Sequence, residues 1–270
     1  MQTSRDESQT SPVGHQHVEI GSATHVGRVR TNNEDFYRVV PALNLLVLSD
    51  GIGGQANGEV ASEMAVETIV NYCLELPTGG STYNGIESDP ELSEKTNQLV
   101  NAVILANRSI HDASVHDPQL QGMGATLVAA WIDALRLSLV HVGDSRAYLL
   151  RAGELESLTA DHTLVAEQVR NGLLTLEQAQ TNPLRRLLIR VLGVREEVEI
   201  DIHEHELCNG DVLLLCTDGL TGMVPESEIA DILVHEIDAQ SAADHLVASA
   251  NAHGGEDNVS AIVLHITGNS

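Results

Sequence analysis

Short apolar runs alternate along the chain with longer stretches in which apolar residues recur every three or four positions. A short run bounded by polar or Gly-rich turns is typical of a β-strand. Two runs, 43–48 and 212–216, are almost wholly apolar and predict strands covered on both faces, whereas the alternation in 197–206 predicts an exposed strand. The predicted strands are residues 18–25, 43–48, 125–132, 136–142, 146–151, 154–158, 197–206, 212–216 and 259–266.

Helical spacing marks most of the remaining stretches. Residues 161–193 are expected to form short helices, with breaks at Asn171-Gly172 and Asn182-Pro183. Residues 77–90 are rich in Gly, Ser and Thr and are predicted to form a loop. The predicted long helices are residues 58–76, preceded by Asn57 as N-cap, a helix from about Glu91 to Ala113, and residues 225–237 and 241–252.

Three of the predicted strands follow one another with almost no chain between them. The connections are Asp133-Ala134-Leu135 and Gly143-Asp144-Ser145, which are too short for the crossover that parallel strands require. We therefore expect each of these strands to pair with the next in antiparallel orientation. Antiparallel strands with helices inserted between them predict an α+β layered domain rather than a doubly wound parallel sheet.

The length of 270 residues suits one domain with a substantial core, because no Pro- or Ser-rich linker divides the chain. The polar residues 1–17 are predicted to be a disordered tail, which leaves 18–267 for the domain. No apolar run reaches membrane-spanning length, and the start has no apolar signal-peptide core. We therefore expect a soluble, cytoplasmic protein.

The formal net charge of -25 narrows the possible partners. Nucleic acid and an anionic membrane would both require a basic patch, so neither is expected to bind, whereas cations are compatible with this charge. The three cysteines, Cys73, Cys208 and Cys216, are odd in number and lack the spacing of metal ligands. They are predicted to be buried, reduced thiols.

The apolar run that begins near residue 43 ends abruptly in an acid. Asp50 is followed by Gly51, Gly53 and Gly54, which allow a tight turn and leave room for a ligand close to the backbone. The same construction, a strand leading into Asp-Gly, recurs at Asp218. Further acids end or flank predicted strands at Asp35, Asp144 and Asp257.

Carboxylates gathered at strand ends favour a site for hard divalent cations. Mn²⁺ and Mg²⁺ take oxygen ligands and normally keep several waters, so a few carboxylates suffice. Two such ions about 4 Å apart can share a carboxylate and a water, and they make that water a nucleophile at neutral pH. Each acid taken singly is more often a turn or cap residue. The combination of five is what favours a metal centre.

Seven motifs, in order along the chain, resemble those of the metal-dependent type 2C (PPM) protein phosphatases, particularly the small bacterial serine/threonine members. Together they cover roughly residues 18–267. The motifs are VRTNNED at 29–35, SDGIGG at 49–54, GMGAT at 122–126, HVGDSRAY at 141–148, DHTLV at 161–165, TDGL at 217–220 and GEDN at 255–258.

The resemblance implies a four-layer α/β/β/α sandwich, in which two antiparallel sheets are flanked by helices and the metals lie in a cleft at one edge. It implies hydrolysis of phosphoserine and phosphothreonine on proteins, by a hydroxide that bridges two core Mn²⁺ or Mg²⁺ ions. The expected enzyme is a monomer that opposes a bacterial serine/threonine kinase. Residues 161–193 match the mobile flap of bacterial members.

The same resemblance implies roles for individual residues. Asp50 bridges both ions, and the Gly51 carbonyl binds one of them. Asp218 and Asp257 hold the other ion. Asp35, together with Glu34, binds directly or through ordered water.

Two further positions complete the implied site. Asp144 matches the acid that, with Asp218, holds a weaker third ion in bacterial relatives. Arg30 matches the residue that grips the substrate phosphate, a task that suits the planar guanidinium fork.

Two positions depart from the family pattern. Ile52 stands where many eukaryotic members carry a histidine proposed as general acid, although bacterial members also have an apolar residue there. Asn182 replaces a histidine that often precedes the proline of the flap, which leaves the substrate preference open.

Other readings of the sequence are weaker. A cysteine-dependent phosphatase needs an arginine six positions after the cysteine, and an aspartyl-phosphate enzyme needs Asp-x-Asp; both are absent. No contiguous loop of calcium ligands occurs, and His203-Glu204-His205 is explained by an exposed strand rather than by zinc. A catalytically inactive binding module of the same fold stays an alternative, although such a module usually lacks a metal acid.

Overall fold

A computed structural model describes residues 17–53, 57–76 and 88–267. The predicted loop at 77–90 and Gly54 therefore fall largely or wholly outside the described residues. The first of two antiparallel sheets has the strand order β1-β11-β10-β7-β8. Its strands are β1 (His17–His25), β7 (Arg146–Arg151), β8 (Glu154–Ser157), β10 (Val212–Cys216) and β11 (Val259–Thr267).

The second sheet has the strand order β2-β3-β5-β6-β9, with the short strand β4 paired to β3. All of its pairings are antiparallel. Its strands are β2 (Asp35–Val40), β3 (Leu45–Ile52), β4 (Gly124–Ala125), β5 (Leu127–Asp133), β6 (Arg136–Val142) and β9 (Asp201–Glu206).

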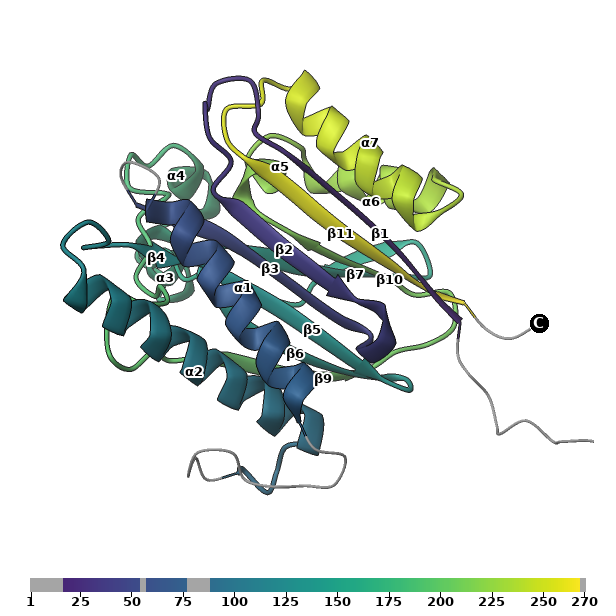
Figure 1. The fold of residues 1–270 in the computed structure, drawn as a ribbon. Coiled ribbons are helices and arrows are strands. Elements are labelled where there is room, and N and C mark those ends of the chain that lie inside the picture. The colour runs from purple at the N-terminus through teal and green to yellow at the C-terminus, as the bar shows by residue number, and fades with distance from the viewer. Residues whose placement is uncertain (1–16, 54–56, 77–87, 268–270) are drawn as a thin grey trace, which may run out of the picture.

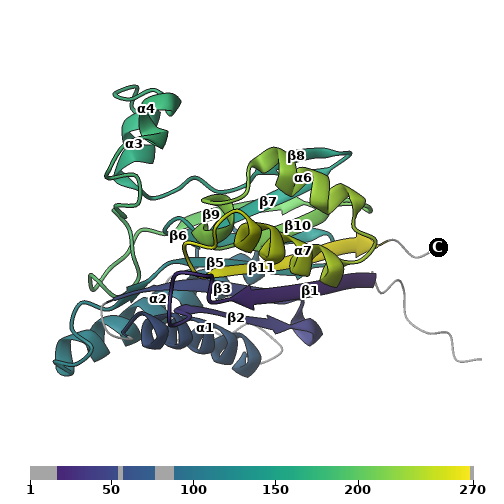
Figure 2. The same ribbon diagram turned by 90° about the horizontal axis from the view of Figure 1, so that it is seen from above.

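Helices cover the outer face of each sheet, so the molecule has four layers (Figures 1 and 2). α1 and α2 pack on the second sheet, whereas α6 and α7 pack on the first. Figure 2 shows α3 and α4 projecting from one end of the sandwich. The helices are α1 (Asn57–Glu75), α2 (Glu94–His116), α3 (Leu164–Arg170), α4 (Leu176–Gln180), α5 (Asp218–Thr221), α6 (Glu226–His235) and α7 (Ala239–Ala252), with a 3-10 turn at Pro41–Leu43.

The side chains of β3 show how the layers are held together. Leu45 and Val47 pack in the cluster beneath α1 and α2, while Leu46 and Leu48 point into the cluster between the two sheets. All four are fully buried. Burying one such side chain contributes roughly 1.5–3 kcal/mol. The predictions of an α+β sandwich and of a doubly covered strand are thus confirmed.

The prediction that β6 and β7 pair with each other is wrong. β6 lies in the second sheet and β7 in the first, so the turn of residues 143–145 carries the chain from one sheet to the other. Gly143 has φ +110, and a Cβ there would lie 2.7 Å from the Thr126 side chain. The short turn is possible because a glycine can take this conformation against the neighbouring strand. It places Asp144 where the two sheets meet.

Three strand boundaries also differ from prediction. No strand is predicted at residues 35–40, but Asp35 begins β2, a strand that periodicity does not reveal. The run predicted at 43–48 begins at Leu45 and continues to Ile52. The strand predicted at 197–206 begins only at Asp201, because its partner β6 ends at the pair His141↔Asp201. Its residues are also half-buried rather than exposed, except for the last.

The ends of the helices follow their caps. α2 begins at Glu94 rather than near Glu91, because the Ser93 side chain accepts a hydrogen bond from Thr96 N–H. α7 begins at Ala239, where Asp238 caps it in the same way. α1 includes Asn57, which was predicted to precede it.

Two predictions about exposure and termini are corrected. Cys73 and Cys216 are buried, and burial raises the pKa of each thiol to about 12, but Cys208 is exposed. It lies in the turn before β10, where no core surrounds it. His17, assigned to the tail, pairs with Thr267 at the start of β1, while residues 1–16 lie outside the described residues.

Within the described ranges, no helix combines the length and apolar character that a membrane crossing requires.

Candidate active site

Two acids of the site come from neighbouring strands of the second sheet. Asp35 and Asp50 stand opposite each other in the β2–β3 register. Asp50 follows the buried run of β3, and Thr126 fixes its backbone: Asp50 N–H donates to Thr126 Oγ1 at 3.0 Å, and Thr126 N–H donates to the Asp50 carbonyl at 2.8 Å. The next residue has to be glycine, because a Cβ on Gly51 would lie 2.0 Å from a backbone oxygen of α1.

Three more acids come from the ends of strands in the first sheet or between the sheets. Asp218 lies two residues after β10, and Asp257 lies two residues before β11. Asp144 occupies the crossing turn between β6 and β7. These segments converge on a cleft of about 230 Å³. Its lining includes the predicted residues Arg30, Glu34, Asp50, Gly51, Asp144, Asp218 and Asp257.

Asp35 is the one predicted site residue that does not line this cleft. It is buried, and its Oδ2 accepts hydrogen bonds from Thr217 Oγ1 at 2.9 Å and Ser260 Oγ at 2.7 Å. Its other oxygen, Oδ1, has no hydrogen-bond partner among the described residues. Asp35 thus stands behind Asp50, tied to the strands of the opposite sheet.

The acids of the cleft are largely buried, and too few positively charged groups lie near them to balance their negative charge. Burial raises the pKa of Asp50 well above its ordinary value, and the charges of Asp35 and Asp218 raise it further. Burial raises the pKa of Asp35 to about 7 against the opposing hydrogen bonds of Ser260 and Thr217. Burial also raises the pKa of Asp144 to about 8, with Asp218 adding to the effect.

The pKa of Asp218 is also raised, by burial and by the neighbouring charge of Asp257. Its Oδ1 is buried and has no hydrogen-bond partner in the described part of the chain. A buried carboxylate oxygen without a partner is unfavourable unless a cation or water completes it. The donor set, all oxygen and mostly carboxylate, fits Mn²⁺ or Mg²⁺.

Arg30 enters the cleft from the loop before β2. Its Nη2 lies 3.0 Å from both oxygens of Asp257, and half of its side chain is exposed. Asn258 holds this loop in place: its Oδ1 accepts from Glu34 N–H, and its Nδ2 donates to the carbonyls of Val26 and Asn32. Arg30 therefore lies beside the acids, with its fork accessible to an anionic ligand.

His162 is the second residue of the predicted flap and the histidine of that segment. It does not line the cleft, and it is buried. Its Nδ1 accepts a hydrogen bond from Gly143 N–H at 3.1 Å, and its Nε2 lies 3.1 Å from Asp201 Oδ2. Both ring nitrogens are engaged, so this histidine holds the residue before Asp144 rather than facing a ligand.

His141, His162 and Asp201 form a separate group whose potential ligand atoms lie within 4.8 Å of one another. Arg190 already occupies the position of a cation there: its Nη1 lies 2.7 Å from Asp201 Oδ1 and 3.2 Å from His162 Nε2. Burial and the neighbouring His162 lower the pKa of His141 to about 3, so its ring is neutral. His162, held by Asp201 and Arg190, is thus the member of this group that supports the crossing turn.

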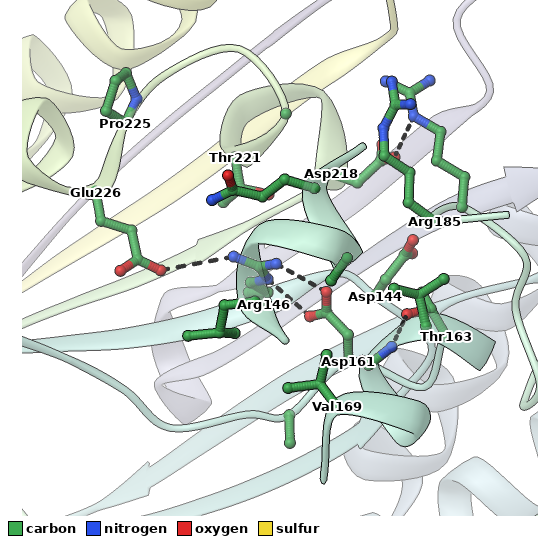
Figure 3. A pocket seen from close by; sticks show the side chains of 18 of the residues that line it. Asp144, Arg146, Asp161, Thr163, Val169, Arg185, Asp218, Thr221, Pro225 and Glu226 are labelled. Carbon is green, nitrogen blue, oxygen red and sulfur yellow. Dashed lines mark hydrogen bonds and ion pairs between the residues drawn. The ribbon is translucent and has the colours of Figure 1, made fainter. Parts of the chain in front are cut away.

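A second, larger pocket of about 600 Å³ adjoins the cleft and shares Asp144 and Asp218 with it. Figure 3 shows Asp161 and Arg146 on its floor, with Arg146 between Asp161 and Glu226. The segment 161–193, with α3 and α4, forms one wall of this pocket.

Comparison with known proteins identifies the family to which this chain belongs. Residues 24–257 match the profile of the protein phosphatase 2C family. This chain belongs to the protein phosphatase 2C family. The chain is 39% identical over 246 residues to the serine/threonine phosphatase Stp of Listeria welshimeri, which covers 89% of this chain and 93% of that protein.

Solved structures of 2C phosphatases have the same architecture. The Mycobacterium tuberculosis serine/threonine phosphatase PstP superposes with a TM-score of 0.81 at 36% identity, covering 93% of this chain and 99% of that one. A structure of the PstP catalytic domain in complex with two manganese ions gives a TM-score of 0.79 at 36% identity, covering 93% and 98%. The recognition of a 2C-type sandwich from the sequence is thus confirmed.

Sequence reasoning missed several residues that shape this 2C phosphatase site. Asn258 belongs to the GEDN motif, but its role in tethering the Arg30 loop depends on contacts between distant segments. Asp201 and Arg190 support the crossing turn from the edge strand, and Arg186 reaches the acids from the flap. Only the cluster of arginines between residues 185 and 195 hinted at this, as one of the few basic spots on an acidic chain.

Proposed function

We propose that the cleft hydrolyses phosphoserine and phosphothreonine esters of proteins with the help of two Mn²⁺ or Mg²⁺ ions. Membership of the 2C family makes the chain a metal-dependent serine/threonine protein phosphatase that acts on phosphoproteins. The observation that carries the proposal is the gathering of buried carboxylates, two with an oxygen that has no partner among the described residues, next to an accessible arginine.

Each acid has a position that suits its proposed role. Asp50 lies near Asp35, Asp218, Asp144 and Asp257, whose charges raise its pKa, and it would hold both core ions. Gly51 would contribute its carbonyl, and Asp218 and Asp257 would hold the second core ion from the opposite sheet.

The remaining acids have weaker or indirect roles in this proposal. Asp35, which stands behind Asp50, acts through ordered water, and Glu34 at the rim does the same. Asp144 holds a third, weaker ion with Asp218. When bound, the ions supply positive charge and a nucleophile derived from water at neutral pH.

Arg30 binds the phosphate of the substrate with its guanidinium fork. It is paired with Asp257 at 3.0 Å and is half exposed, so a dianionic phosphate can reach it. The leaving oxygen needs a proton, which neither Ile52 nor His162 is suited to give: Ile52 is apolar, and both ring nitrogens of His162 are engaged elsewhere. Water in the cleft is the proposed donor.

Partners and location follow from this function and stay proposals. A phosphoprotein phosphatase requires a serine/threonine kinase that supplies its substrates. A monomer is the proposed functional unit, because the acids of a single chain suffice for the proposed metal centre. Three free cysteines, one of them exposed, are typical of a reducing compartment and support the cytoplasm. Residues 161–193 act as the flap beside the cleft, and residues 18–267 form the catalytic domain.

The direct test is hydrolysis of an aryl phosphate and of phosphoserine, phosphothreonine and phosphotyrosine peptides with added Mn²⁺. We expect turnover of the aryl ester and of the first two peptides, loss of turnover with a chelator, and recovery when Mn²⁺ is restored. Asp50→Asn serves as the control, folded by circular dichroism but inactive. If calorimetry shows Mn²⁺ bound and no ester is hydrolysed, the chain is the inactive binding module instead.

A further inference from the structure

Arg186 is a flap residue whose side chain reaches the candidate metal acids. Its Nη1 lies 3.1 Å from Asp257 Oδ2, and its Nε lies 3.9 Å from Asp218 Oδ2. It lines both the cleft and the larger pocket. Asp257 therefore lies between two guanidinium groups, Arg30 from the loop before β2 and Arg186 from the flap.

The backbone of the flap fixes where this arginine begins. Immediately after it, the chain runs antiparallel to the start of the flap: Leu164 N–H donates to the Leu187 carbonyl at 2.8 Å, and Ile189 N–H donates to the His162 carbonyl at 2.8 Å. His162 is in turn bonded to Gly143 beside Asp144. Arg186 thus projects from a part of the flap that is anchored to the cleft.

One arginine would be enough to form an ion pair with Asp257, yet two arginines contact it. The side chain of Arg186 is 42% exposed and that of Arg30 is 50% exposed, so neither arginine is a packed core residue. A divalent cation that takes the oxygens of Asp257 and Asp218 would remove the partners of both forks. The anion then nearest to them is the phosphate of a substrate, whose oxygens match a guanidinium fork.

We infer that Arg186 is a second phosphate-binding residue, which grips the substrate phosphate from the flap while Arg30 grips it from the opposite side of the cleft. This inference rests on the proposed function. It makes the flap part of the phosphate site rather than a remote cover. It also predicts that Arg186 opposes cation binding in the absence of phosphate, because its charge competes for the same carboxylates.

The test measures binding separately from turnover. Inorganic phosphate is titrated by calorimetry into the Mn²⁺-loaded protein, and Mn²⁺ is titrated into the metal-free protein. The variants are Arg186→Ala and Arg186→Lys. The matched control is Arg195→Ala, which removes an equal charge at an exposed position just beyond the flap with no ion pair among the described residues.

For Arg186→Ala we expect the Kd of phosphate to rise about tenfold, because a charge-assisted hydrogen-bonding group is lost. We expect the Kd of Mn²⁺ to fall about threefold, since one competing charge is gone. Arg186→Lys should restore Mn²⁺ binding to the wild-type value but only part of the phosphate affinity. Arg195→Ala should change neither constant.

If Arg186→Ala bound Mn²⁺ more tightly but had an unchanged phosphate Kd, the inference would be overturned. Arg186 would then only balance the negative charge of the acids when no metal ion is bound. An equal loss of phosphate affinity in Arg195→Ala would also overturn it, since the effect would then be general charge. If Arg186→Ala fails to fold, the phosphate Kd of Arg186→Lys decides. Wild-type protein that binds phosphate through Arg186 but turns over no ester would refute the proposed function and leave this inference standing.

Discussion

The two ends of strand β10 carry buried aspartates in opposite electrostatic surroundings. Asp211, just before the strand, accepts hydrogen bonds from Arg151 Nε at 3.0 Å, from Arg151 Nη2 at 2.7 Å and from Cys208 N–H at 2.7 Å. Although burial acts in the other direction, these contacts lower its pKa. Asp218, just after the strand, has a buried oxygen without a partner among the described residues and a raised pKa.

The difference shows how one strand serves both stability and function. At the first end, the fold supplies the cation itself, as an arginine, and the carboxylate stabilises the protein. At the second end, the fold gathers like charges and leaves part of their bonding unsatisfied, which costs stability unless metal ions bind. A substitution should therefore have opposite consequences at the two ends.

The largest expected effect is at the unsatisfied end. Asp218→Asn should lower kcat at saturating Mn²⁺ by at least about 100-fold, because a charged ligand of the proposed metal centre is lost. The same change should raise the Tm of the chelated protein, since it removes one of several repelling charges. Phosphatase assays and thermal unfolding measure the two effects. Normal turnover would refute the assignment of Asp218 as a ligand.

The mirror experiment is Asp211→Ala. It should lower the free energy of unfolding by about 2 kcal/mol, because Arg151 and the Cys208 N–H lose their acceptor. The activity of the folded enzyme should be unchanged. Urea denaturation measures the stability, and the exposed Asp231→Ala, expected within about 0.5 kcal/mol of wild type, is the control. If Asp211→Ala lost activity but kept the stability of the wild type, the distinction between a stabilising end and a functional end of β10 would be wrong.

A smaller effect is expected at the support of the crossing turn. His162→Leu should lower kcat about tenfold with little change in KM, because Gly143 loses its acceptor and Asp144 is held less firmly. The matched control is His141→Leu, at a ring whose nitrogens both lack hydrogen-bond partners in the described part of the chain. That variant should keep the activity. Equal losses in both variants would point to general damage of the core rather than to positioning.

The smallest expected effect is the pH dependence of the chelated protein. The folded state holds the pKa of Asp35 at about 7 and that of Asp144 at about 8, mainly through burial, whereas an unfolded aspartate titrates near its ordinary value of about 4. Between these values the folded state binds more protons than the unfolded state, so stability falls as the pH rises from 4 to 8.

In thermal unfolding with a chelator, Tm should therefore be several degrees higher at pH 5 than at pH 8. Added Mn²⁺ should raise Tm more at pH 8, where the acids are ionised and free to bind it. Asp211 contributes no change in stability between pH 5 and pH 8, because its pKa in the folded state is lowered. A chelated protein that is equally stable at both pH values would show that the cleft acids are already neutralised.

The sequence by itself determined most of the elements and pointed to the principal acids of the candidate site. The apolar runs of β3 and β10 and the helical spacing of α1 are local patterns, and they were predicted with small errors at their ends. Asp50 and Asp218 were found because each follows such a run within a short motif. The predictions of these elements succeeded because the period of burial is set by neighbouring residues, which the sequence contains directly.

Only the tertiary structure decided which segments meet. The pairing of β2 with β3 hid Asp35 beneath Asp50, and the passage of the chain between sheets at Gly143 placed Asp144 in the cleft. The contacts of Arg186 with Asp257 and of His162 with Asp201 join residues that no local pattern connects. Such contacts depend on the packing of whole layers against each other, and a short turn is equally compatible with one sheet or with two.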